Sequence, residues 1–151
     1  MCGVMTPTVM VADGRPAAGT QARPVSTGPG APFVTAVRER GRFGRELLVS
    51  PVPPTMCSHD CRYCPTGPAR QLTLERTEFF PLPWLLSQIE SWAGVHGAPD
   101  GIWYECGGDP ALYLRLGELT CCLRCMMPNV RIGVRCNGAL LGDGAVRREL
   151  G

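Results

Sequence analysis

The sequence predicts an α/β fold built on a parallel sheet, because apolar segments of strand length alternate with longer segments of helical period. Three short apolar segments and two amphipathic ones follow in the order strand, helix, strand, helix, strand. At 151 residues, the chain has room for one domain with one modest core. In such sheets, ligands gather beyond the carboxyl ends of the strands, so we expect a functional site there.

The N-terminal segment differs in composition from the rest of the chain. Residues 1–32 are dominated by Gly, Pro, Ala, Thr and Val and have no helix or strand period. Such a segment buries too little apolar surface to offset the entropy lost on ordering, so we predict that it is disordered and that the domain spans residues 33–151. Two interpretations stay open for the arginine run that follows, a solvated lead-in or a contact with a phosphate or carboxylate group; the run comprises Arg38, Arg40, Arg42 and Arg45.

The first predicted strand is the apolar segment at residues 46–50, which ends at Pro51. After a long loop, apolar residues recur every three or four positions from Leu82 to Trp92 and predict a helix. Pro83 suits the first turn of this helix, and Gly94 suits its C-terminal end.

The second and third strands are expected at residues 102–104 and 130–134. A second helix is predicted between them from a stripe of leucines, Leu112, Leu116, Leu119 and Leu123. Residues 143–150 predict the start of a third helix, capped by Asp143.

The loop after the first strand carries three cysteines in a C-x3-C-x2-C pattern, Cys57, Cys61 and Cys64. Three thiolates on one short loop suit three corners of an iron–sulfur cube or three positions around zinc. A cube bound in this way would leave its fourth iron open to a ligand that is not protein. Zinc would need a fourth ligand, for which His59 and Cys106 are the nearest candidates.

The loops after the other two strands complete a pattern that resembles the radical S-adenosylmethionine (SAM) superfamily. The second strand runs into Gly107-Gly108-Asp109-Pro110, which is similar to the Gly-Gly-Glu-Pro motif of that superfamily, and Tyr63 supplies the aromatic residue before the third cysteine. Within the superfamily, the chain is most similar to a group of Fe–S oxidoreductases of unassigned substrate. The resemblance covers residues 34–143, and its further motifs are Arg42-Phe43-Gly44-Arg45, Val52-Pro53-Pro54, residues 72–80, Leu116-Gly117-Glu118-Leu119 and Asn137-Gly138.

The resemblance implies a partial (β/α) barrel of about three parallel βα units, the N-terminal half of a radical SAM domain. It implies that Cys57, Cys61 and Cys64 bind a 4Fe–4S cluster whose fourth iron takes the amino and carboxylate groups of SAM. The reduced cluster would cleave SAM to a 5′-deoxyadenosyl radical, which abstracts hydrogen from an unknown substrate. An electron donor of the flavodoxin or ferredoxin type is the implied partner.

The resemblance also implies roles for residues that contact SAM. Gly107 and Gly108 would let the backbone approach the methionine moiety, and Asp109 would contact its ammonium group. The backbone at Tyr63 would face the adenine. Pro110 and Asn137 complete the expected cofactor-binding residues, and no catalytic residue is assigned.

Two departures from the superfamily pattern qualify these expectations. Asp109 stands where the superfamily usually has Glu, and its side chain is one methylene shorter. The superfamily barrel usually has six βα units, so we expect either a truncated or frameshifted gene product, which is favoured, or half of an assembly completed by a second chain. The alternatives are a small zinc-binding module with a structural or interaction role and a non-catalytic remnant that folds poorly, because half a barrel buries little surface and the truncation has removed the activity.

Bulk properties limit the remaining possibilities. No signal peptide or membrane-spanning apolar segment is recognised, so we predict a cytoplasmic protein whose nine cysteines are reduced. A net charge of +2 gives no indication of nucleic-acid binding. On the second predicted helix, packed thiols and an auxiliary cluster both stay open for Cys121, Cys122 and Cys125.

Overall fold

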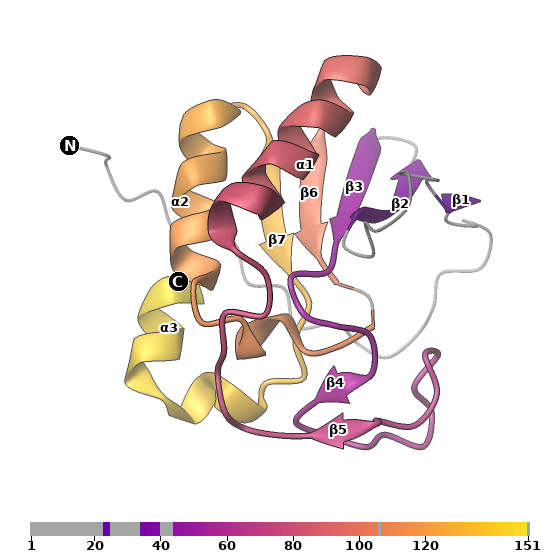
Figure 1. Cartoon of the computed structure of the whole chain (residues 1–151), viewed down its shortest axis with the longest axis vertical. Coiled ribbons are helices and arrows are strands. Elements are labelled where there is room, and N and C mark those ends of the chain that lie inside the picture. The colour runs from indigo at the N-terminus through magenta and orange to yellow at the C-terminus, as the bar shows by residue number, and fades with distance from the viewer. Residues whose placement is uncertain (1–22, 25–33, 40–43, 106, 151) are drawn as a thin grey trace.

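The computed structural model describes residues 23–24, 34–39, 44–105 and 107–150. Its main feature is a five-stranded sheet with the strand order β1-β2-β3-β6-β7. β3, β6 and β7 run parallel, whereas β2 pairs antiparallel with both β1 and β3 (Figure 1). The strands are Arg23–Pro24 (β1), Val34–Glu39 (β2), Arg45–Val49 (β3), Gly101–Tyr104 (β6) and Arg131–Val134 (β7).

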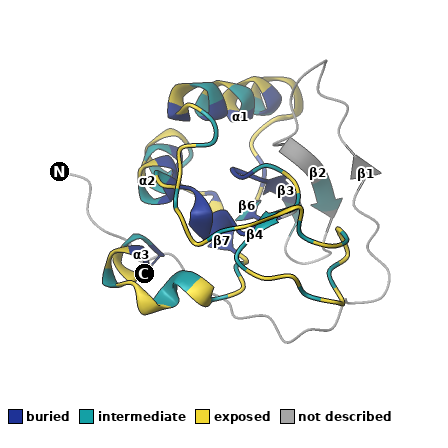
Figure 2. Ribbon diagram, turned by 60° about the horizontal axis from the view of Figure 1, so that its bottom comes forward, coloured by how far each residue is buried: buried dark blue, intermediate teal, exposed yellow. Residues whose placement is uncertain are grey.

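Two helices, α1 (Leu82–His96) and α2 (Leu116–Met126), cover one face of the parallel strands (Figure 1). Buried and exposed residues alternate along both helices, as their apolar stripes predict (Figure 2). Alternate residues of a strand point to the same face, so each parallel strand sends two side chains toward the helices. The core brings together Leu47, Val49, Ile102, Tyr104, Ile132 and Val134 of the strands with Leu85, Ile89, Leu119 and Leu123 of the helices, all at most 5% exposed.

The end of the first helix lies three residues beyond the predicted position. α1 continues through Gly94 and stops at Gly97, which has φ 77° and donates its N–H to the carbonyl oxygen of Ala93 at 2.7 Å. A positive φ favours glycine, and Gly97 supplies this conformation. The prediction that the helix ends at Gly94 is therefore wrong.

The second predicted helix is divided in two. Pro110–Leu112 forms a short 3-10 helix, η2, and α2 begins only at Leu116. Between them the backbone is extended against Thr77, whose N–H donates to the carbonyl oxygen of Leu112 at 3.0 Å and whose carbonyl oxygen accepts from Leu114 at 3.1 Å. This pairing uses backbone groups that a continuous helix would need.

The N-terminal part of the sheet has no counterpart among the predicted strands. Only Arg23 and Pro24 of the segment predicted to be disordered are described, and they pair with β2; the rest of residues 1–32 lies outside the described residues. Two members of the arginine run, at positions 40 and 42, also lie outside them. Arg45 has a structural role, because it donates to the carbonyl oxygen of Ala98 at 3.1 Å and lies over the ring of Trp92.

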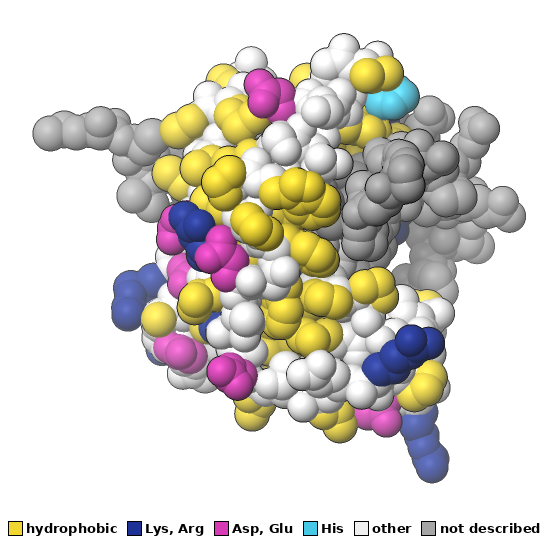
Figure 3. Space-filling model, in the orientation of Figure 1, with side chains coloured by type: hydrophobic (Ala, Val, Ile, Leu, Met, Phe, Trp, Pro, Cys, Tyr) yellow, Lys and Arg dark blue, Asp and Glu magenta, His cyan; other side chains and the backbone are white. Residues whose placement is uncertain are grey.

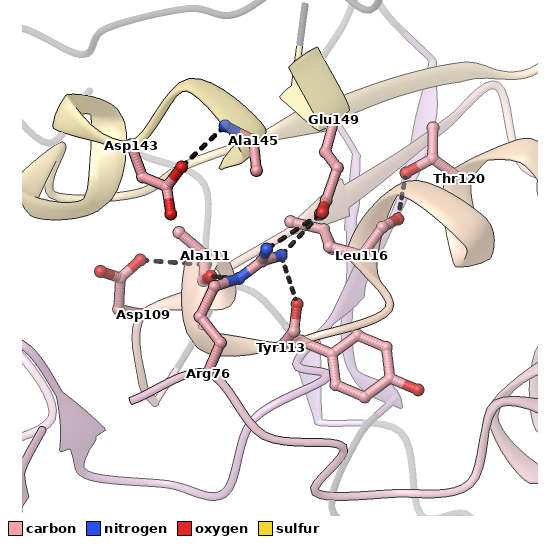
Figure 4. Close-up of polar contacts among 9 residues, drawn as sticks. All are labelled: Arg76, Asp109, Ala111, Tyr113, Leu116, Thr120, Asp143, Ala145 and Glu149. Carbon is pink, nitrogen blue, oxygen red and sulfur yellow. Dashed lines mark hydrogen bonds and ion pairs between the residues drawn. The ribbon is translucent and has the colours of Figure 1, made fainter. Parts of the chain in front are cut away.

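Arg76 fixes the long loop to the C-terminal part of the chain (Figure 4). Its side chain is 13% exposed and donates to the carbonyl oxygens of Ala111 and Tyr113 at 3.0 and 2.9 Å. It also pairs with Glu149 of α3 (Gly144–Leu150), with Nη1 to Oε1 at 3.0 Å. Arg76 therefore joins residues 72–80, η2 and α3.

The surface shown in Figure 3 carries hydrophobic side chains near its middle and most of its charged side chains toward the edge. Among the helices of the described residues, none is long and apolar enough to cross a membrane.

Candidate functional site

Three loops leave the carboxyl ends of β3, β6 and β7 on the same edge of the sheet (Figure 1). The first is the cysteine loop, in which β4 (Met56–Cys57) pairs in parallel with β5 (Gln71–Leu72). The second contains the Gly-Gly-Asp-Pro sequence, and the third, after β7, contains Asn137. The three loops that carry the sequence motifs therefore lie on one edge of the sheet, as predicted.

Side-chain hydrogen bonds join all three loops through Ser58. Its hydroxyl donates to Oδ2 of Asp109 at 3.0 Å and accepts from Nδ2 of Asn137 at 2.8 Å. The same Nδ2 lies 3.4 Å from Sγ of Cys57. Oδ1 of Asn137 accepts from the N–H of Ala139 at 2.9 Å, which fixes the orientation of the amide. We call Ser58, Asp109 and Asn137 the three-loop network.

Asp109 is the buried member of this network, at 2% exposure. Oδ1 accepts from the N–H of Ala111 at 3.1 Å and so caps η2, while Oδ2 contacts Ser58. Burial raises the pKa of the Asp109 carboxyl, and the hydrogen bonds from Ala111 and Ser58 oppose this rise. Pro110 begins η2 and is buried.

The two glycines before Asp109 pack against the cysteine loop. Gly107 has φ 89°, a conformation that favours glycine. A Cβ on Gly108 would collide with the carbonyl oxygen of Met56 and lie 3.0 Å from that of Pro53. The N–H of Asp109 donates to the same Met56 oxygen at 3.1 Å. The missing side chain of Gly108 thus allows close backbone contact between the second loop and the start of the cysteine loop.

The three loop cysteines are free thiols of intermediate exposure. A turn links two of them, with the N–H of Cys64 donating to the carbonyl oxygen of Cys61 at 3.0 Å, and Sγ of Cys64 lies 3.0 Å from Oγ1 of Thr66. Within the described residues, no three His, Cys, Asp or Glu side chains are gathered as a metal site. The donor chemistry of three soft thiols fits an iron–sulfur cluster or zinc, and the thiols would have to turn toward one another to bind either.

The remaining candidates differ in their surroundings. The side chain of Tyr63 is 87% exposed, and His59 is exposed on the cysteine loop. Cys136 is half-buried, and burial raises the pKa of its thiol. Cys106, the other candidate zinc ligand, lies outside the described residues.

Sequence reasoning missed two features of this edge. Ser58 connects the loops, yet a serine between two cysteines carries no distinctive pattern. Glu105, at the end of β6, is 4% exposed and forms ion pairs with Arg38 of β2 and with Arg135 after β7, the latter at 2.9 Å. These pairs link β6 to β2 and to the segment after β7, and they give Arg38 a carboxylate contact within the protein.

Fold and site together define an α/β protein with a three-thiol loop at the carboxyl edge of parallel strands. The chain is 27% identical over 111 residues to a protein of Methanocaldococcus jannaschii described as "UPF0026 protein MJ1312". The match covers 72% of this chain and 34% of that protein, so the chain spans about a third of the length of this curated relative. No family model and no solved structure matches the chain.

Proposed function

We propose that this chain is part of a radical SAM iron–sulfur protein, in which Cys57, Cys61 and Cys64 hold a 4Fe–4S cluster that leaves one iron open to SAM. The observation that carries the proposal is the three-loop network, because it joins the cysteine loop to the two loops whose motifs resemble the SAM-binding motifs. A structural zinc site would not require these loops to be joined.

The chain's own residues would ligate the cluster and orient SAM. When bound, the cluster and SAM together supply one-electron cleavage of the sulfonium and hydrogen abstraction from substrate. The Asn137 amide would donate a hydrogen bond to the Cys57 thiolate, which helps set the potential of a cluster. Asp109, held by Ser58, would offer a carboxylate to the SAM ammonium group.

Two partners follow from this proposal. An electron donor of the flavodoxin or ferredoxin type would reduce the cluster. In the described sheet, β7 is a terminal strand. A second chain or further βα units would then add the rest of a barrel beyond β7, and the substrate would be chosen by residues from both parts.

Metal content after anaerobic reconstitution with iron and sulfide tests the proposal. We expect about four irons and four sulfides per chain, the composition of one cube, and a brown protein. Cys61→Ala should lose most of this iron, whereas Cys122→Ala, with its thiol on α2, should retain it. A colourless protein that binds one zinc and excludes iron would overturn the proposal in favour of a zinc-binding module.

A further inference from the structure

Helix α2 carries a second group of thiols, away from the three-loop network. Cys121 and Cys125 are exposed, and Cys122 is half-buried against the core. Residues four apart lie one above the other on the same side of a helix. Cys121 and Cys125 therefore form a pair of neighbouring thiols on the solvent side of α2, with Cys122 turned toward the core.

Helical geometry makes this pair unsuitable for a disulfide. Side chains four apart on a helix have Cβ atoms about 5–6 Å from each other, whereas a disulfide needs about 3.5–4.5 Å. Closing the bond would distort the last turns of α2, whose leucines at 119 and 123 are fully buried. The two thiols are thus held close to each other while the helix resists their oxidation to a disulfide.

The same separation suits one metal ion placed between the two sulfurs. With metal–sulfur bonds close to the length of a zinc–thiolate bond, about 2.3 Å, a linear two-coordinate ion spans roughly 4–5 Å between its sulfurs. Side-chain rotation of two cysteines in adjacent turns can provide this span without moving the helix. Soft thiolates select Cu(I), and two such ligands satisfy it without a third protein donor.

We propose that Cys121 and Cys125 bind one Cu(I) ion on the exposed side of α2. Each thiol loses its proton and forms one copper–sulfur bond, so binding releases two protons and changes no oxidation state. This site is separate from Cys57, Cys61 and Cys64 and does not depend on their binding a cluster.

Anaerobic titration of the reduced full chain with Cu(I), in competition with bicinchoninate, tests the site. Cys121→Ser and Cys125→Ser should each bind one Cu(I) fewer than the unmodified protein. Cys122→Ser should bind the same amount, because its thiol is turned toward the core. All four proteins keep the cysteine loop, so any copper bound there cancels in the comparison.

Far-UV circular dichroism of the copper-free proteins checks that the three variants keep their helices. Cys122→Ser should retain a copper ion that Cys121→Ser loses. X-ray absorption should show two sulfur ligands on this ion. Unchanged stoichiometry in Cys121→Ser or Cys125→Ser would overturn the proposal. Equal loss of copper from Cys122→Ser would overturn it as well, since the ion would then not be held by the exposed pair.

Discussion

The contact between Gly108 and the cysteine loop leads to a specific prediction for Gly108→Ala. The added Cβ would lie 3.0 Å from both the carbonyl oxygen of Pro53 and Cγ1 of Val52, and would collide with the carbonyl oxygen of Met56. Gly108 is not among the glycines with positive φ. The substitution therefore acts through steric overlap with neighbouring backbone and not through backbone strain.

Overpacking of this kind costs about 1–3 kcal/mol, and two of the three atoms are backbone oxygens, which have little freedom to move. We therefore expect Gly108→Ala to lower the free energy of unfolding by about 2 kcal/mol. Gly94→Ala is the matched control, because Gly94 lies within α1 and its new Cβ would meet nothing within 4 Å. It should raise the free energy of unfolding by about 0.5–1 kcal/mol.

Urea unfolding of the metal-free protein, followed by circular dichroism, measures both variants. The shift of Met56 that relieves the overlap would also displace Cys57, so Gly108→Ala should bind less iron on reconstitution. If Gly108→Ala unfolds at the same urea concentration as the unmodified protein, the second loop does not pack closely on the cysteine loop.

Three further predictions concern polar contacts. Ser58→Ala leaves the buried Asp109 carboxylate without its hydroxyl partner and should lower the free energy of unfolding by about 1–3 kcal/mol. The control Ser87→Ala, at an exposed serine, should change it by less than about 0.5 kcal/mol. Equal changes in the two variants would contradict the three-loop network. Arg76→Met should lower the free energy of unfolding in urea by about 1–3 kcal/mol, since it leaves two carbonyl oxygens and Glu149 without their donor. If the free energy falls no further than in the exposed control Arg148→Met, the structural role of Arg76 is refuted. Because the pKa of Asp109 is raised from its ordinary 3.8, its protonation favours the folded state below pH 3.8 and this contribution is lost as pH rises through the raised pKa. The stability of the unmodified protein relative to Asp109→Asn should therefore fall as the pH rises from 3.8 through the raised pKa, and a flat or rising difference would contradict the burial of this carboxyl.

The elements that the sequence predicts well are those whose signal is local. The apolar run of β3 and the leucine-rich stripe of α1 depend only on neighbouring residues, and both are present at nearly the expected positions. The choice between Gly94 and Gly97 as the end of α1 depends on which glycine reaches a positive φ. The sequence alone does not show this, because both positions carry the same residue type.

Features that depend on contacts distant in sequence could not be predicted. The break before α2 arises from pairing with Thr77, and β2 is held by β3 through backbone hydrogen bonds that have no side-chain pattern. The candidate site likewise has a part that depends on local sequence and a part that depends on distant contacts. Cysteine spacing identifies the loop, but the role of Ser58 depends on Asn137, which lies 79 positions further along the chain.

The electron paramagnetic resonance spectrum of the reconstituted, reduced protein shows whether a cluster on the cysteine loop has an iron that SAM can reach. If three cysteines hold a 4Fe–4S cluster with one open iron, the reduced protein will give a cluster signal whose g-values shift when SAM is added, and Cys61→Ala will give no such signal. A cluster signal that is unchanged by excess SAM would show that no iron is open to it. That result would contradict the account even if iron and sulfide were both present.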